Sequence, residues 1–223
     1  GDQYISPDYA DQTFSIDVDG AKKILTDAGY TWKDDALIDP DGEPVSFTLS
    51  DPQGWSDYVT GIQLVATQVK DTLGADAQVA TPDADTWFAN VASGDFDAVL
   101  HWTGSGTNPW HIYDDVMNST YLDQEVDGNV ADNFGRYSNP EATELLAQYA
   151  QASDDDTRTE ALYGLEKIFV EDVPAIPIGT HPMLGEYNTR NYTGWPSEDD
   201  PYATADPVQP QAVQVLMNLK PVE

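Results

Sequence analysis

Helical and strand-like segments alternate through the first half of the chain, and this alternation restricts the fold more than any other feature. Helical periodicity is clear in "DVDGAKKILTDAGY", "GWSDYVTGIQLVATQVKDTLG" and "TPDADTWFANVAS". Strand-like runs lie between and after them, at Val45 to Leu49, "AQVAT" and "GDFDAVLHW". Strands that alternate with helices favour a layered sheet covered by helices. The sequence therefore predicts an α/β fold.

Residues typical of helix ends mark the boundaries of these helices. The expected caps are Asp17 or Asp19, Ser56 or Asp57, Thr81 and Asn139, with Gly29 as a stop and Pro82 and Pro140 at first helical positions. The acidic stretch "DDALIDPDGEPVSFTLS" does not fit a calcium loop, because Leu37 and Thr48 would stand at the first and last ligand positions. A β-turn centred on Asp41-Gly42 explains it better.

The second half begins with two predicted helices, "RYSNPEATELLAQYAQ" and "DTRTEALYGLEKIFVED". The segment "VPAIPIGTHPMLGEYNT" predicts two strands that meet at a corner, and its prolines indicate an edge position. Beyond Asn191 the chain has little periodicity until "QAVQVLMNL". The α/β core is therefore expected at about residues 15–190.

Acidic side chains outnumber basic ones along the whole chain, with 40 Asp and Glu against 9 Lys and Arg and a formal net charge of −31. Such a surface repels itself in dilute buffer, whereas the Debye length falls to about 3 Å in 1 M salt. This composition indicates a salt-adapted organism. It disfavours nucleic acid as a partner, because phosphate binding requires basic patches.

Motifs for catalysis are weak. The sequence has no cysteine, and His101, His111 and His181 lack the spacing of a metal site. It has no nucleophile elbow, phosphate-binding loop or dinucleotide fingerprint. We therefore expect no enzyme activity, no catalytic residues, no cofactor and no metal site.

Tryptophans flank an uncharged loop in "DAVLHWTGSGTNPWHIYDD". Trp102 ends a predicted strand, Trp110 follows the loop, and Trp55 precedes a helix. Ligands of open α/β sheets bind beyond the carboxyl ends of strands, where these three indoles are expected. Trp87, within a predicted helix, is expected to fill the core.

The ordered segments of this chain resemble family 5 of the extracellular solute-binding proteins of ABC importers. The resemblance lies in "DGAKKILTDAGY", "DGEPVSFTL", "IQLVATQVKDTLGADAQV", "DTWFANVASGDFDAVLHW" and "RYSNPEATELLAQYAQASDDDTRTEALYGLEKIFVEDVPAIPI". It implies that residues 1–223 are the C-terminal lobe of a periplasmic-binding-protein-like receptor (type II, cluster C) with two lobes. Residues 191–223 would then pack back toward the missing N-terminal lobe.

The same resemblance implies a cellular role. The full-length protein would be an extracellular lipoprotein, anchored in the membrane at the cell surface. It would be a monomer whose lobes close on solute and deliver it to the cognate permease. A purely adhesive surface domain is the alternative outside transport, and the sequons at Asn118 and Asn191 are compatible with such exposure.

One departure from the family concerns the solute. In peptide-binding members the Trp is followed by a loop whose Asp pairs with the peptide amine, and Ser105 stands near that position here. An unpaired buried ammonium would cost several kcal/mol, so the resemblance favours an uncharged oligosaccharide of the cello- or manno- type. An oligopeptide is the runner-up, with Asp57 or Asp114 replacing the missing carboxylate. The expected ligand-binding residues are Trp55, Asp57, Trp102, Ser105, Thr107, Asn108, Trp110 and His111.

We expect the chain to lose structure at low salt, because its excess negative charge is then unscreened. Melting followed by circular dichroism should give a Tm that rises from dilute buffer to multimolar KCl. A Tm that does not depend on salt would contradict salt adaptation.

Overall fold

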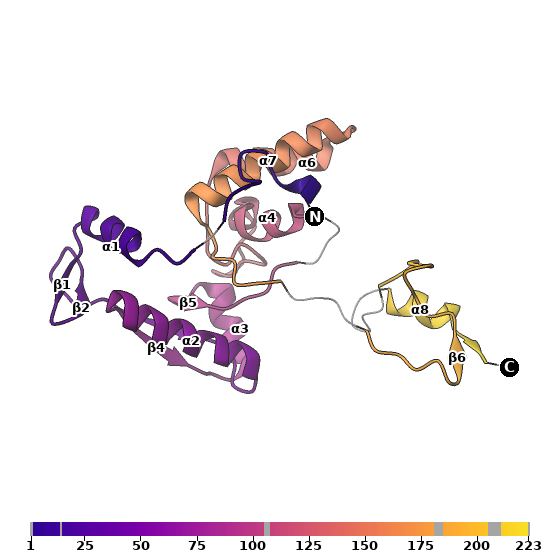
Figure 1. Cartoon of the computed structure of the whole chain (residues 1–223), viewed down its shortest axis with the longest axis horizontal. Helices are drawn as coiled ribbons and strands as arrows, with labels where there is room; N and C mark the ends of the chain where they lie inside the picture. Colours follow the sequence, from indigo (N-terminus) through magenta and orange to yellow (C-terminus); the bar gives the residue numbers. More distant parts are fainter. Residues whose placement is uncertain (1, 14, 105–107, 181–184, 205–210, 223) are drawn as a thin grey trace. The chain divides into compact units, whose positions relative to one another are not determined.

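Two units divide the chain, and each has its own set of elements (Figure 1). The first unit comprises Gly1–Ile176 and the second Pro177–Glu223. The structure is a computed structural model that describes all residues except 1, 14, 105–107, 181–184, 205–210 and 223. In the described part of the chain, no helix is both long and apolar enough to span a membrane.

A three-stranded parallel sheet forms the centre of the α/β part of the first unit. Its strands are β3 (Ser46–Ser50), β4 (Asp76–Ala80) and β5 (Ala98–Val99), in the order β4-β3-β5. The crossover helices are α2 (Ser56–Leu73) and α3 (Ala84–Ser93). Leu49 of β3 packs with Ile62 and Ala66 of α2 in one buried cluster. The predicted α/β alternation is therefore confirmed.

An N-terminal helix and a hairpin precede this sheet. They are α1 (Val18–Asp27), β1 (Thr31–Lys33) and β2 (Ala36–Ile38), and the two strands pair antiparallel. The Trp32 indole N–H donates to the carbonyl of Leu73 at 2.7 Å, which ties the hairpin to the end of α2. The turn that follows is closed by Gly42 N–H and the Asp39 carbonyl, so its centre lies one residue earlier than predicted.

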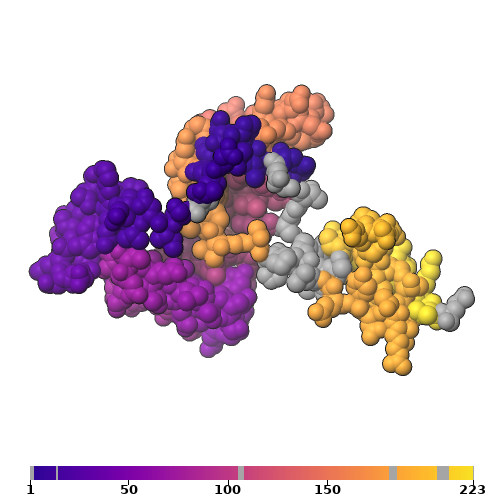
Figure 2. All heavy atoms as spheres, viewed as in Figure 1, coloured from indigo at the N-terminus to yellow at the C-terminus, as the bar shows by residue number. Residues whose placement is uncertain are grey.

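Helices make up the other part of the first unit. These are η1 (Asp2–Tyr4), α4 (Trp110–Met117), α5 (Thr120–Asp123), α6 (Pro140–Gln151) and α7 (Asp155–Asp172). Figure 2 shows this group beside the sheet elements in the same unit. Its buried core consists of Met117, Ala142, Leu146, Leu162, Leu165 and Ile168. The two long helices predicted in the second half are thus confirmed, and they pack on each other and on α4.

Helix caps were predicted correctly at some ends and wrongly at others. Asp17, Asn139 with Pro140, and Gly29 occupy the predicted positions. The predicted cap of α2 was wrong, because the helix already begins at Ser56, directly after the turn at Gly54 (φ 92°), so that Ser56 and Asp57 lie in its first turn. Trp55 holds the cap position, and its indole cannot accept a hydrogen bond. The predicted cap of α3 at Thr81, with Pro82 as the first helical residue, was also wrong. The Asp83 carboxylate accepts the Thr86 N–H and caps α3 two residues later.

The prediction of two strands at 173–189 was wrong, since the described residues of that range contain none. Pro174 and Pro177 lack the N–H group that a strand ladder requires, and Val173 ends α7 in a left-handed conformation. The second unit instead pairs β6 (Tyr192–Thr193) with β7 (Lys220–Pro221) and contains α8 (Ala212–Asn218).

Replacing Leu165 with alanine should destabilise the first unit by about 2–5 kcal/mol, because this side chain is fully buried in the helical core. The free energy of unfolding in denaturant, measured on this chain, checks the value. Leu64→Ala on α2 is the control, since Leu64 is 59% exposed. An equal loss in the two variants would contradict the helical core described above.

Candidate ligand-binding site

A buried carboxylate and several aromatic rings lie at the carboxyl ends of β3 and β5. After β3 the chain passes through Asp51 and Pro52, both buried, and turns at Gly54 into α2. The Trp87 indole N–H of α3 donates to the Ser50 carbonyl at 3.0 Å and so fixes α3 against the end of β3. This edge is where open α/β sheets bind ligands.

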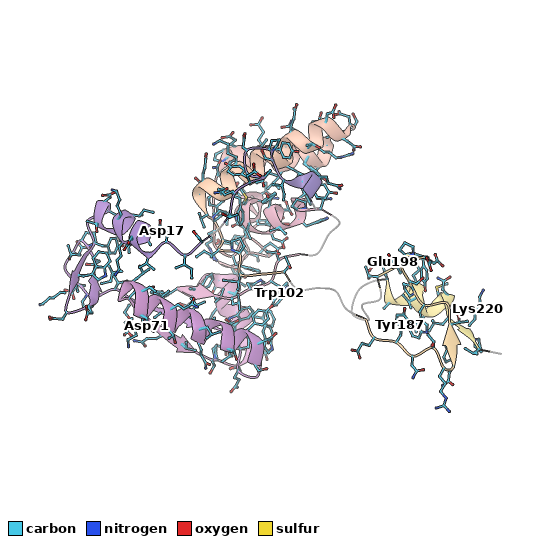
Figure 3. The ribbon with its side chains drawn as sticks, in the orientation of Figure 1. Asp17, Asp71, Trp102, Tyr187, Glu198 and Lys220 are labelled. Atoms are coloured by element: carbon cyan, nitrogen blue, oxygen red, sulfur yellow. The ribbon has the colours of Figure 1, made fainter. Side chains whose placement is uncertain are left out.

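Aromatic rings gather at this edge, and we call the set the aromatic cluster. Its members are Trp55, Tyr58, Trp87, Phe88, His101 and Trp102. Trp87 is fully buried, which confirms the prediction that it fills the core. Trp102, labelled in Figure 3, is 46% exposed, and its ring centroid lies 5.9 Å from that of Trp55. The cluster therefore has a buried base and a solvent-facing aromatic surface.

His101 joins the buried and exposed sides of the aromatic cluster. Its ring stacks on Trp87 with 13° between the planes and on Trp102 with 22°. Burial lowers the pKa of His101 and so favours the neutral ring. Its Nδ1 lies 2.5 Å from the Trp102 carbonyl, and because a carbonyl only accepts, Nδ1 carries the hydrogen. Nε2 is then an acceptor.

Asp51 lies at the end of the central strand and is fully buried. Its Oδ2 accepts the Leu100 N–H at 3.2 Å, whereas Oδ1 has no hydrogen-bond partner among the described residues. Burial raises the pKa of Asp51 to about 6, the Leu100 N–H opposes this rise, and the charge of Asp57 adds to it. The sequence analysis missed Asp51, and its one signal was an acidic residue placed directly after a strand.

A group of carboxylates lies beyond the loop that follows Trp102. Asp115 accepts the Gly104 N–H, and Asp114 accepts hydrogen bonds from Asn118 at 2.8 Å and Tyr121 at 2.9 Å. Burial raises the pKa of Asp115 and of Asp132. The charge of Asp114 adds to both rises, and the charge of Asp115 adds to the rise at Asp132. Across the residues with described positions, no cluster of His, Cys, Asp or Glu could hold a metal ion.

The other predicted site residues are spread over both parts of the first unit. Asp57 is exposed in the first turn of α2, beside Trp55. Asn108 accepts the Trp110 backbone N–H at 3.0 Å, and the His111 ring lies edge-on to the Trp110 indole. Ser105 and Thr107 lie outside the described residues.

Trp110 has partners in the helical core. Its indole N–H donates to the Leu146 carbonyl at 3.2 Å, and its ring stacks on Tyr149 with 20° between the planes. These contacts account for Trp110 through packing. The structure thus brings Trp55, Asp57 and Trp102 to one edge of the sheet and places Trp110 and His111 on α4.

Comparisons with known proteins give one matching family model and several similar solved structures. Residues 1–124 match the model of the bacterial extracellular solute-binding proteins, family 5 Middle. The periplasmic oligopeptide-binding protein of an oligopeptide ABC transporter from Thermotoga maritima, solved with mannohexaose bound, is 28% identical, with a TM-score of 0.80 over 98% of this chain. AppA from Bacillus subtilis, solved with a nonapeptide, is 20% identical with a TM-score of 0.64 over 99% of this chain.

The chain spans 42% of the length of each of these two solved structures. NikZ from Campylobacter jejuni, in complex with Ni(L-His), is 19% identical, with a TM-score of 0.63 over 73% of this chain and 32% of its own. Among curated proteins no sequence matches the chain. The fold is therefore an α/β domain that matches part of the cluster C periplasmic binding proteins.

Asp51→Asn should stabilise the chain by about 1–3 kcal/mol at pH 7. The raised pKa means that the folded state holds the Asp51 proton more tightly than the unfolded state. Stability from this group is therefore present below pH 4 and lost as the pH rises through about 6, and the variant's advantage should shrink toward pH 4.

Denaturant unfolding at a series of pH values, at fixed high salt, measures the difference between the variant and the wild type. Asp71→Asn removes an equal charge from an exposed position on α2 and is the control (Figure 3). If Asp51→Asn is instead less stable than the wild type at pH 7, the ionised Asp51 carboxylate stabilises the folded state, which contradicts this prediction.

Proposed function

We propose, because this chain belongs to family 5 of the bacterial extracellular solute-binding proteins, that it is the C-terminal lobe of a receptor that delivers an oligosaccharide to an ABC permease. Residues 15–190 would form the core of that lobe, and residues 191–223 would pack toward the rest of the polypeptide. The receptor would be a monomer anchored at the cell surface. Salt adaptation of its acidic surface belongs to the same proposal.

Members of this family are non-enzymatic transport receptors, which confirms the expectation that the chain catalyses no reaction. The mechanism we propose is binding followed by closure of two lobes, with the solute enclosed between them. This chain would supply one wall of the site. Since it spans 42% of the first matched structures, we expect the isolated chain to bind solute weakly.

The observation that carries the saccharide proposal is the exposed part of the aromatic cluster. Trp102 and Phe88 are 46% and 44% exposed, and Trp55 contacts both. A flat indole packs on the C–H face of a sugar ring, and nearby polar groups bind its hydroxyls. We assign the stacking role to Trp102 and Trp55. Trp110 and His111 would border the site on its helical side, where Trp110 acts through its packing on Tyr149.

The Thermotoga maritima relative supports a saccharide as solute, because its structure holds mannohexaose. The loop between Trp102 and Trp110 adds no charged side chain of its own. An uncharged ligand needs no countercharge from that loop. We therefore expect a neutral chain of sugar rings rather than an ionised solute.

An oligopeptide remains the second candidate, and one observation favours it. Asp114, Asp115 and Asp132 interact electrostatically, and together they create a negative potential that would attract a peptide amine. The same Thermotoga maritima relative is named as an oligopeptide-binding protein. Thermal-shift and calorimetric titration of the full-length receptor with cello-, manno- and xylo-oligosaccharides and with mixed peptides separates the two solutes.

Trp102→Ala should weaken binding of the saccharide by about 1–3 kcal/mol, because the exposed indole face is lost. Trp110→Ala should mainly lower the Tm, because its ring packs on Tyr149 and its N–H is bonded to Leu146. Calorimetric Kd values and melting curves of the full-length variants measure both effects.

Ile24→Ala is the control for Trp102→Ala, since Ile24 is 71% exposed on α1. It should change neither the Kd nor the Tm. Unchanged affinity in Trp102→Ala and in Trp55→Ala would eliminate the aromatic surface as a ligand contact.

A further inference from the structure

Asp51 occupies the junction of the two segments that carry the exposed tryptophans. Its backbone N–H donates to the Ala80 carbonyl at 3.2 Å, and its Oδ2 accepts the Leu100 N–H, so it joins the ends of all three strands. Trp55 follows it by four residues, in the turn that leads into α2. Trp102 follows its partner Leu100 by two residues. Asp51 thus lies at the root of both chains that form the aromatic surface.

The side chain of Asp51 is only half satisfied. A carboxylate can accept at both oxygens, and a buried acceptor that lacks a donor costs free energy. Oδ1 lacks a donor among the described residues, although the residue is fully buried. The charged groups nearby do not help, because Asp57 has the same sign. Among the described residues, Asp51 Oδ1 is therefore a buried acceptor whose hydrogen-bonding capacity is unused.

We propose that Asp51 is a ligand-binding residue whose free Oδ1 accepts a hydrogen bond from a hydroxyl group of the bound saccharide. This inference rests on the proposed function. Sugars present hydroxyl donors at the rim of the same ring whose C–H face packs on an indole. A sugar stacked on Trp102 or Trp55 would direct a hydroxyl toward the strand ends, where Asp51 lies.

Access to Oδ1 requires a shift of the side chains above the strand ends. We assign this shift to Trp102, because it is half exposed and follows Leu100, the hydrogen-bond partner of Asp51, by two residues. Gly54, with φ 92°, lies in the turn that precedes Trp55 and has a backbone conformation that few other residues adopt readily. Ligand binding would then exchange ring contacts for a hydrogen bond to Asp51 Oδ1, which has no partner among the described residues.

A role of Asp51 in binding and a role in the fold predict different combinations of Kd and Tm in the variants. A residue kept for stability loses stability when replaced, whereas Asp51→Asn, which keeps an oxygen for the Leu100 N–H, should keep or raise the Tm and at the same time weaken binding. Asp51→Leu removes the acceptor of that N–H as well, so its Tm does not separate the two roles and only its Kd is compared. A hydrogen bond to a charged group is worth more than one to a neutral group. We expect Asp51→Leu to raise the Kd about 10- to 100-fold, and Asp51→Asn to raise it less.

The experiment uses the full-length receptor and mannohexaose or, if another oligosaccharide of the panel binds more tightly, that one. Calorimetry gives the Kd of the wild type, Asp51→Asn, Asp51→Leu and the exposed control Asp71→Asn, and melting without ligand gives each Tm. Weaker binding in both Asp51 variants, with an unchanged Kd in the control, supports the role.

Equal Kd values in the wild type and both Asp51 variants overturn it, and would mean that a buried water serves Oδ1. A fall in the Tm of Asp51→Asn that accompanies its weaker binding also overturns it, because Asp51 would then act through the fold. If the wild type binds no oligosaccharide of the panel, the proposed function fails and the role of Asp51 fails with it. Saccharide binding by the wild type thus separates the two failures.

Discussion

The burial of Trp87 is the constraint on which the rest of the site depends. Its indole fills the space between α3 and the end of β3, and its N–H is bonded to the Ser50 carbonyl. The remaining rings pack on this base, with Trp55 at 5.6 Å and His101 at 5.4 Å between ring centroids. Trp87 cannot shift without breaking that bond, so it gives the outer layer of the aromatic cluster a fixed base. Trp102 belongs to that layer, which suits a ligand contact.

Repulsion among the acidic side chains opposes folding of this chain, and the ion pairs offset little of it. The ion pairs of the described residues, such as Lys23 with Asp27 at 2.6 Å and Lys167 with Glu171, lie on exposed helix faces, where such pairs contribute little. Packing and hydrogen bonding to the backbone must therefore hold the fold against a net charge of −31. Screening by salt would relieve the repulsion without any new contact.

The order of elements could be predicted from the sequence because it depends on local periodicity and capping. Asn139 before Pro140, for example, marks the start of α6 whatever surrounds it. The start of α2 was predicted one or two residues too late, since Ser56 and Asp57 have the side chains of caps but lie in the first turn of the helix. The extended run at 173–189 looked like a pair of strands, but pairing depends on a partner strand that local sequence does not reveal.

The candidate site was harder to predict, because its chemistry depends on tertiary neighbours. Trp102 and Trp110 flank one loop and look equivalent in the sequence, yet only Trp110 meets Leu146 and Tyr149 of α6. Asp51 was hidden among 40 acidic residues, and its burial distinguishes it. Asp51 differs from the exposed carboxylates in two properties, its full burial and an Oδ1 without a partner among the described residues, and these two properties are the grounds for the binding role proposed for it.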